Sequence, residues 1–394
     1  MILKVDGLLI KLLITVLQCE RIIPMKLTWL NNGFICKELY APFILDNDYD
    51  YLQDLSKKYS LIFEQALRAG ADDESLHIIS KYKKKITEAL KCYYNADIAK
   101  CNTIIKNLIV DIGHDKLAVD CLNNSYAFHG RQGQEIQFFR CRLGNPSESF
   151  SVKEMLFLPI EMRSKAGNYR FSIPGNPSFY LSNSSYGCWI ETGFPADIDS
   201  NVSPVVLDGT QKIFNLAISS RDFSCLNEFE ENRVHCWLKL FMLSIATSYR
   251  IKETGRTLKS EYIISQSIMM ACKKVGYDGV AYYSKRVSDE IFAFCAINLA
   301  LFVDYSNKND SIANHIKMDD SYNFALYKKL NSSLKYKRYD LRSVNTGLIT
   351  NIGSYERQYP YRETDFYEFD QFLFSTWTDK PNNTGKDYVE WGIK

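Results

Sequence analysis

Three side chains with complementary chemistry lie within one short stretch of the sequence, NYRFSIPGNPSFYLSNSSYGCWIE (168–191). Arg170 precedes Tyr180 by ten residues, and Glu191 follows Tyr180 by eleven. An arginine binds phosphate through paired charge-assisted hydrogen bonds, and a tyrosine stacks on a flat ring while its hydroxyl forms a hydrogen bond. A carboxylate holds a sugar hydroxyl and stabilises positive charge that develops at an anomeric carbon. A ligand that combines phosphate, ribose and a cationic ring, such as NAD, fits all three.

The elements that must position this trio can be predicted from the same stretch. SIPGNP (172–177) contains two prolines and a glycine, which force a turn. SFYLS (178–182) then reads as a short strand, in which Tyr180 points away from both of its neighbours. The following SNSS (182–185) offers several helix N-caps, so a helix that carries Glu191 is expected. A turn, a strand and a helix can bring the three side chains together.

Each member of the trio also has an ordinary structural explanation. Arg170 could be a surface ion-pair partner, Tyr180 a half-buried strand residue, and Glu191 a solvated helix residue. Their ordered combination favours a site over three unrelated roles.

The rest of the chain predicts a helical region followed by a mixed domain. Apolar residues recur every three or four positions in 50–70 and 74–94, which is typical of amphipathic helices. After a Gly-containing polar break at 129–134, helical patterns return at 234–250 and 260–276. Runs rich in β-formers lie between and after these segments, at 135–143, 168–173, 178–182, 203–209, 278–284 and 291–305.

We therefore expect an α+β protein in three parts. A mainly helical N-terminal region covers 1–130, a domain with a mixed β core covers 131–305, and a C-terminal extension with a loose tail covers 306–394. The apolar stretch 7–19 contains a lysine and is too short to span a bilayer. It is predicted to be a buried element, or else Met25 is the native start and 1–24 are not part of the protein.

Composition excludes several classes of function. The net charge of +2 gives little electrostatic drive toward nucleic acid or an anionic membrane, so neither is expected as a partner. The eleven cysteines show no CxxC pair and no Cys/His ladder with metal-ligand spacing. We interpret them as reduced thiols of a cytoplasmic protein, with no metal site and no resident cofactor.

Several segments together resemble the RES-domain family. They are FFRCRLG, then MLFLPIEMRSKAGNYRFSIPGNPSFYLSNSSYGCWIE, and much later GYDGVAYYS. The family is named for its Arg, Glu and Ser, and its members include NAD-degrading toxins of bacterial toxin–antitoxin pairs. The resemblance spans roughly 135–305 and is densest over 156–191. It implies a fold similar to ADP-ribosyltransferases and a reaction at the nicotinamide N-glycosidic bond.

The resemblance implies catalytic roles for the opening trio. Arg170, Tyr180 and Glu191 match the family's central arginine, tyrosine and glutamate. Arg170 would grip the pyrophosphate, Tyr180 would pack beside the nicotinamide ribose or ring, and Glu191 would stabilise the oxocarbenium-like transition state.

The resemblance also implies a set of substrate-binding residues. Ser284 matches the family's late serine and would hydrogen-bond the nicotinamide ribose or a phosphate. Arg140 matches an early arginine, with Arg142 as a competing alignment, and either would hold pyrophosphate or an incoming phosphate. Arg163 lies in the family-like stretch before the central arginine.

Three functions follow from this reading. The first is an NAD-consuming enzyme, an NAD phosphorylase or glycohydrolase that acts as a growth-arrest or defence toxin. NAD is then the substrate, inorganic phosphate a candidate co-substrate, and an antitoxin or regulatory protein a candidate partner. The second is mono-ADP-ribosylation of a protein target. The third is an interaction protein that binds a nucleotide without turnover.

Overall fold

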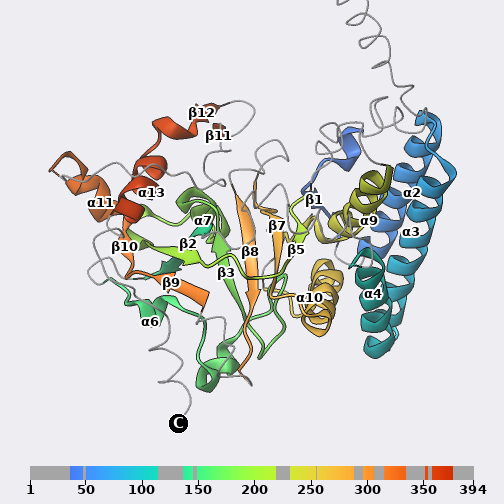
Figure 1. Cartoon of the computed structure of the whole chain (residues 1–394), viewed down its shortest axis with the longest axis horizontal. Coiled ribbons are helices and arrows are strands. Elements are labelled where there is room, and N and C mark those ends of the chain that lie inside the picture. Colours follow the sequence, from blue (N-terminus) through green and yellow to red (C-terminus); the bar gives the residue numbers. More distant parts are fainter. Residues whose placement is uncertain are drawn as a thin grey trace, which may run out of the picture.

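The computed structural model is centred on an eight-stranded mixed sheet. Its order is β10-β4-β2-β3-β8-β7-β5, and β9 also pairs with β4 (Figure 1). Neighbouring strands are antiparallel except β5 and β7, which are parallel. The structure describes residues 36–47, 50–113, 136–144, 149–218, 231–253, 255–287, 296–305, 315–333, 351–353 and 357–375.

The strands of this sheet are short, and most are buried. In chain order they are β2 (Ile136–Leu143), β3 (Ser178–Ser182), β4 (Ser200–Leu207), β5 (Ile213–Leu216), β7 (Gly279–Tyr283), β8 (Ile297–Phe302), β9 (Ile316–Met318) and β10 (Tyr322–Asn323). Two smaller pairs lie outside it: β1 (Phe43–Ile44) with β6 (Tyr249–Arg250), and β11 (Asn351–Gly353) with β12 (Gln358–Pro360).

Helices surround the sheet on several sides. They are α2 (Tyr51–Ala69), α3 (Asp73–Tyr94), α4 (Ile98–Gly113), α6 (Val152–Met155), α7 (Ser185–Glu191), α9 (Glu231–Thr247), α10 (Ile263–Val275), α11 (Phe324–Leu330) and α13 (Asp365–Ser375). The short 3-10 turns are η2 (Lys37–Leu39), η4 (Ile160–Lys165), η5 (Asp197–Asp199), η6 (Ser260–Tyr262), η9 (Asn331–Ser333) and η10 (Tyr361–Glu363). The predicted α+β class, with a helical N-terminal region and a mixed sheet, is confirmed.

Local sequence signals explain where the N-terminal helices begin and end. Helix α2 stops at Gly70, which has a left-handed φ of 83° that favours glycine. Helix α3 starts after Asp72, whose side chain accepts a hydrogen bond from the Ser75 amide at 2.8 Å. Most periodic apolar residues of both helices face inward, as their spacing predicts, whereas Leu67 near the end of α2 is 56% exposed.

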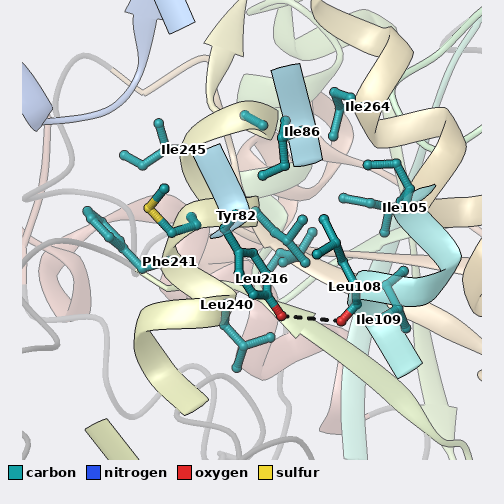
Figure 2. Close-up of a cluster of buried hydrophobic side chains, with 14 of the residues drawn as sticks. Tyr82, Ile86, Ile105, Leu108, Ile109, Leu216, Leu240, Phe241, Ile245 and Ile264 are labelled. Carbon is teal, nitrogen blue, oxygen red and sulfur yellow. Dashed lines mark hydrogen bonds between the residues drawn. The ribbon is translucent and has the colours of Figure 1, made fainter. Parts of the chain in front are cut away.

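The N-terminal helices share one hydrophobic core with the sheet domain. Helices α9 and α10 lie between the sheet and the layer formed by α2, α3 and α4 (Figure 1). Figure 2 shows side chains from α3, α4, α9, α10 and β5 converging in this core. The Tyr82 hydroxyl of α3 also donates to the Leu108 carbonyl of α4 at 3.3 Å. The region 1–130, as far as it is described, is therefore packed against the sheet domain through a continuous apolar interface.

A large-to-small substitution in this shared core should destabilise the whole protein. Ile105 of α4 is fully buried, with 0% of its surface exposed. Ile105→Ala should lower the free energy of unfolding by about 2–5 kcal/mol, because it removes buried methyl groups and leaves a cavity. Ile98→Ala on the same helix, where the side chain is 47% exposed, should change it by less than about 1 kcal/mol. Denaturant unfolding of both variants measures the difference, and equal effects would contradict a common core.

The C-terminal extension adds to the sheet. Val205 of β4 faces Met318 of β9, and Val202 of β4 faces Tyr322 of β10. Helices α11 and α13 cover this end of the sheet (Figure 1). The expected loose tail, the apolar stretch 7–19 and the polar break 129–134 lie outside the described residues.

The two faces of the sheet carry different side chains. We call the side of Tyr180, Ser182 and Asn298 the front face, since the β3–β8 register places Ser182 opposite Asn298. The back face carries Phe179 and Leu181, which belong to a separate hydrophobic cluster. The predicted alternation of β3 is thus present, and it directs Tyr180 toward the side covered by α9 and α10.

Close packing of β7 on β8 requires a glycine at one position. A Cβ atom at Gly279 would lie 2.7 Å from the carbonyl oxygen of Ala300, closer than side-chain carbons approach backbone.

Across the described residues, we find no helix with both the length and the apolar character needed to cross a bilayer.

Candidate functional site

Glu191 is the final residue of helix α7, and the start of that helix is fixed by a side-chain cap. The Ser184 hydroxyl accepts a hydrogen bond from the Gly187 amide at 2.9 Å. Further along α7, the Cys188 thiol contacts the Phe139 carbonyl of β2 at 3.3 Å, so the helix lies on the front face. Glu191 is half-buried at its end. A short, capped helix thereby holds the carboxylate against the sheet.

Asn298 of β8 holds the carboxylate of Glu191. Its Nδ2 donates to Glu191 Oε1 at 2.6 Å, and the asparagine is only 2% exposed. Its Oδ1 is buried, and no described group forms a hydrogen bond with it. A buried amide oxygen without a partner is costly and unusual, and such groups are found at functional sites. The bond to Glu191 is therefore the one described side-chain hydrogen bond of Asn298, and it couples the two groups.

Arg170 is buried and fixed by backbone oxygens. Its Nη1 and Nη2 donate to the carbonyls of Thr247 and Tyr249 at 2.6 and 2.7 Å, and it is 8% exposed. The guanidinium also lies over the Tyr262 ring, 5.0 Å from its centroid. Arg170 is thus not a surface ion-pair residue. Two of its five N–H donors are occupied by these carbonyls, and three remain for another group.

The carbonyls that fix Arg170 are in turn connected to the N-terminal helices. The Tyr249 hydroxyl donates to Asp54 of α2 at 2.7 Å. The Tyr51 hydroxyl, also on α2, donates to the Ala246 carbonyl near the end of α9 at 2.7 Å. The N-terminal layer therefore supports the segment that holds the arginine.

The hydroxyl of Tyr180 closes the turn that precedes its strand. It accepts a hydrogen bond from the Phe171 amide at 3.2 Å and lies 2.9 Å from the Ser172 hydroxyl. Burial raises the pKa of Tyr180 above its usual value, although these hydrogen bonds and the charge of Arg170 act against the rise. Tyr180 is therefore a neutral phenol that fixes the turn carrying Arg170, and its ring is half-buried beside Tyr169.

The charges of Arg170 and Glu191 both act on two further tyrosines. Burial raises the pKa of Tyr282 well above its usual value; the charge of Glu191 adds to the rise and that of Arg170 opposes it. Burial also raises the pKa of Tyr262, and again the two charges act in opposite directions. The geometry agrees, since Phe171, next to Arg170, contacts Tyr282 with ring centroids 4.9 Å apart, and strand pairing sets Tyr282 opposite Asn298, which holds Glu191.

Ser284 and Arg286 lie on the segment that continues from β7. Ser284 is buried, and its hydroxyl accepts a hydrogen bond from the Arg286 amide at 3.1 Å. The Arg286 guanidinium lowers the pKa of Tyr262, against the larger effect of burial. A Cβ atom on Gly193 would lie 3.3 Å from Arg286 Nη1, which places this guanidinium next to the turn just after Glu191.

Arg140 and Arg142 do not join this group. The register of β2 with β3 pairs Phe139 with Ser182, so these arginines belong to the back face. Arg140 donates to the carbonyls of Met155 and Tyr180 at 3.3 and 2.9 Å. These bonds fix helix α6 and strand β3 at the back of the sheet.

Arg142 and Arg163 likewise bond to backbone oxygens. Arg142 donates to the Glu154 carbonyl and lies over the Phe150 ring, 4.9 Å from its centroid. Arg163, on η4, is exposed and donates to the Gly175 carbonyl at 3.0 Å. Arg163 thus stabilises the turn between Arg170 and Tyr180.

Sequence reasoning missed Asn298, Tyr262 and Arg286. One signal was present for Asn298, because it is the single polar residue of the run AINLALF (296–302). Arg286 follows Ser284 by two residues, but nothing in the pattern distinguished it from other arginines. No cluster of three His, Cys, Asp or Glu side chains suited to a metal is found among the described residues.

Helix α13 of the C-terminal extension supports α7 from outside. Asp370 accepts hydrogen bonds from the Ser185 amide of α7, at 3.1 Å, and from the Tyr361 hydroxyl. Burial raises the pKa of Asp370 from 3.8 to about 7, although these hydrogen bonds act in the opposite direction. A carboxyl group whose pKa is raised to about 7 therefore joins the extension to the helix that carries Glu191.

The raised pKa of Asp370 predicts a pH-dependent stability. Between about pH 4 and pH 7 the unfolded chain releases this proton while the folded protein keeps it, so the free energy of unfolding falls as pH rises. Asp370→Asn removes this contribution. Denaturant unfolding at about pH 4.5 and pH 7.5 should show a smaller decrease for Asp370→Asn than for wild type. Asp365→Asn, exposed on the same helix, should behave like wild type; parallel pH profiles for all three would contradict the shift.

Comparisons with known proteins give one match in sequence. No family model matches the chain. A stretch of 183 residues is 31% identical to a Bacillus subtilis (strain 168) protein named "Putative toxin YopC". The match covers 43% of this chain and 40% of that protein, so the chain spans less than half the length of the relative it matches.

One solved structure was also matched. It is the crystal structure of the M. tuberculosis MbcT–MbcA toxin–antitoxin complex, at 13% identity and a TM-score of 0.27. The match covers 55% of this chain and 98% of that chain.

Proposed function

We propose that this protein is a toxin that consumes NAD by cleaving the nicotinamide N-glycosidic bond. The observation that carries the proposal is the carboxylate of Glu191, held by Asn298 at 2.6 Å, while Tyr282, the strand partner of Asn298, contacts Phe171 next to Arg170. A positioned carboxylate and a partly unoccupied arginine on neighbouring elements suit a substrate with a cationic anomeric centre and phosphates. The 31% identity to a protein named as a toxin supports the biological class.

In this proposal the chemistry is electrostatic. Glu191 stabilises the positive charge that builds at the ribose carbon as neutral nicotinamide leaves, and Asn298 keeps the carboxylate aimed at that carbon. Arg170 offers its remaining N–H donors to a phosphate oxygen. Tyr180 keeps the arginine-bearing turn in place through its bonds to Phe171 and Ser172.

The proposal sets the reaction in the cytoplasm, where NAD is available. A cell that makes such an enzyme has to restrain it, so we expect an antitoxin or regulatory protein as a partner. The acceptor that takes the ADP-ribose unit is inorganic phosphate, water or a protein side chain, and each gives a different product.

Product analysis tests the proposal directly. Purified full-length protein is incubated with NAD labelled in the adenine ring, with and without inorganic phosphate, and the products are identified by mass spectrometry. We expect release of nicotinamide in stoichiometric amounts with ADP-ribose or its phosphorylated form. Label attached to macromolecules would instead identify a transferase. Folded protein that releases no nicotinamide under any of these conditions would refute NAD cleavage.

A further inference from the structure

Among the described residues, no hydrogen bond or ion pair gives the Arg286 side chain a structural role. Arg286 is half-buried, and its guanidinium forms no hydrogen bond or ion pair with any described group. Arg140, Arg142, Arg163 and Arg170, in contrast, all donate to backbone carbonyls. A partly desolvated guanidinium with unused donors is stabilised when an anion binds to it.

One close approach places Arg286 beside the turn that follows Glu191. Its Nη1 lies near Gly193, two residues after Glu191, at 3.3 Å from where a Cβ would be. Its charge acts on the Tyr262 phenol, on which the charges of Arg170 and Glu191 also act. The ring of Tyr262 in turn lies beneath the Arg170 guanidinium. Tyr262 is thus affected by two guanidinium groups from different elements, one of them in direct contact with its ring.

Ser284 supplies a second donor on the same segment. It is 1% exposed, and the one hydrogen bond between its hydroxyl and a described group is the one that the oxygen accepts from the Arg286 amide. The hydroxyl proton is therefore available to an acceptor. The bond also links the two residues, since it orders the backbone from which the Arg286 side chain leaves.

We propose that Arg286 completes, with the Ser284 hydroxyl, a phosphate-binding subsite next to the turn that follows Glu191. The resemblance already implies a bond from Ser284 to ribose or phosphate, and Arg286 is the new member. The inference rests on the proposed function and adds to it the residues that hold the phosphate. The resemblance had implied this role for Arg140 or Arg142. Those two arginines point to the back face, where their donors fix α6 and β3. The phosphate is either part of the dinucleotide's pyrophosphate or free inorganic phosphate that attacks the ribose.

Binding measurements with two probes separate the sources. Calorimetric titrations in chloride buffer use inorganic phosphate and, separately, ADP-ribose, with wild type, Arg286→Gln and Ser284→Ala. Loss of a charged hydrogen-bond donor should weaken binding of the relevant probe about ten- to a hundredfold, and loss of the hydroxyl about tenfold. Arg68→Gln, at an exposed position of α2, is the matched control and should bind like wild type.

Each outcome decides the proposal. Weaker binding of inorganic phosphate alone assigns the subsite to the acceptor, weaker binding of ADP-ribose alone assigns it to the pyrophosphate, and weaker binding of both assigns it to a position that the two share. Unchanged binding of both probes by Arg286→Gln, or no binding of either by wild type, overturns the subsite. Because no turnover is needed, a protein that binds through Arg286 but releases no nicotinamide would refute the proposed reaction and leave the subsite standing.

Discussion

Replacing Glu191 with glutamine should reduce the rate of the proposed NAD cleavage by about a hundred- to a thousandfold. In the proposed mechanism the substitution removes the negative charge that faces the developing oxocarbenium ion, and effects of this size follow when one preorganised electrostatic group is lost. The introduced glutamine keeps an oxygen that can accept the bond from Asn298, whose Nδ2 lies 2.6 Å from the carboxylate in the wild type. We therefore expect the fold and the affinity for substrate to change little. Nicotinamide release under saturating NAD measures the effect on kcat.

A matched substitution separates charge at the site from charge in general. Glu161→Gln, at an exposed position on η4, should leave the rate at the wild-type value. The melting temperature of Glu191→Gln, with and without NAD, reports whether folding and binding are intact. A Glu191→Gln protein that turns over NAD at the wild-type rate would remove Glu191 from the mechanism.

Replacing Asn298 with aspartate should make the activity strongly dependent on pH. Two carboxyl groups at hydrogen-bond distance cannot both ionise freely, so the pair holds one proton to a higher pH than either group alone. In the singly protonated state the introduced aspartate can donate to Glu191 as the asparagine does. At higher pH both carboxyl groups are charged and repel each other, so the carboxylate of Glu191 moves from its position. Misplacement of this kind costs up to about a hundredfold in rate.

The expected signature is a variant that gains activity as pH falls, relative to wild type. Asn298→Ala provides the contrast, because it loses the donor without adding a titrating group and should be slow at every pH. Asn351→Asp, exposed on β11, should follow the wild-type pH profile. An Asn298→Asp profile that runs parallel to wild type would show that Asn298 does not act through the ionised Glu191.

Much of the secondary structure was predictable because its causes are local. Helix α10 ends at Gly276, which has a left-handed φ of 87°, and α2 ends in the same way at Gly70. Glycine favours this conformation, so the residue type alone predicts both helix ends. The run 168–173 was harder. Its β-forming residues predicted a strand, but the structure has only the isolated bridges Tyr169–Ser172 and Ile173–Asn176. The prolines and glycine that follow bend the chain before a ladder can form.

The candidate site was predictable in part, for a physical reason. Arg170, Tyr180 and Glu191 are joined by one turn, one strand and one short helix, so local rules could bring them together. Asn298 reaches Glu191 through the pairing of β8 with β3, and the sequence does not contain that register. The same limit applies to Arg140, since a shift of one residue in β2 would move it to the other face.

The carbonyl groups that bind Arg170 connect the N-terminal helices to the proposed catalytic site. The oxygen atoms that hold this arginine belong to Thr247 and Tyr249, and the Tyr249 hydroxyl is tied to Asp54 of α2. A chain trimmed to residues 131–394 would uncover the apolar sides of α9 and α10 and free the strand that grips the guanidinium. A minimal fragment designed to retain the proposed activity should therefore keep α2, and local unfolding of that helix should abolish the proposed activity before the sheet unfolds.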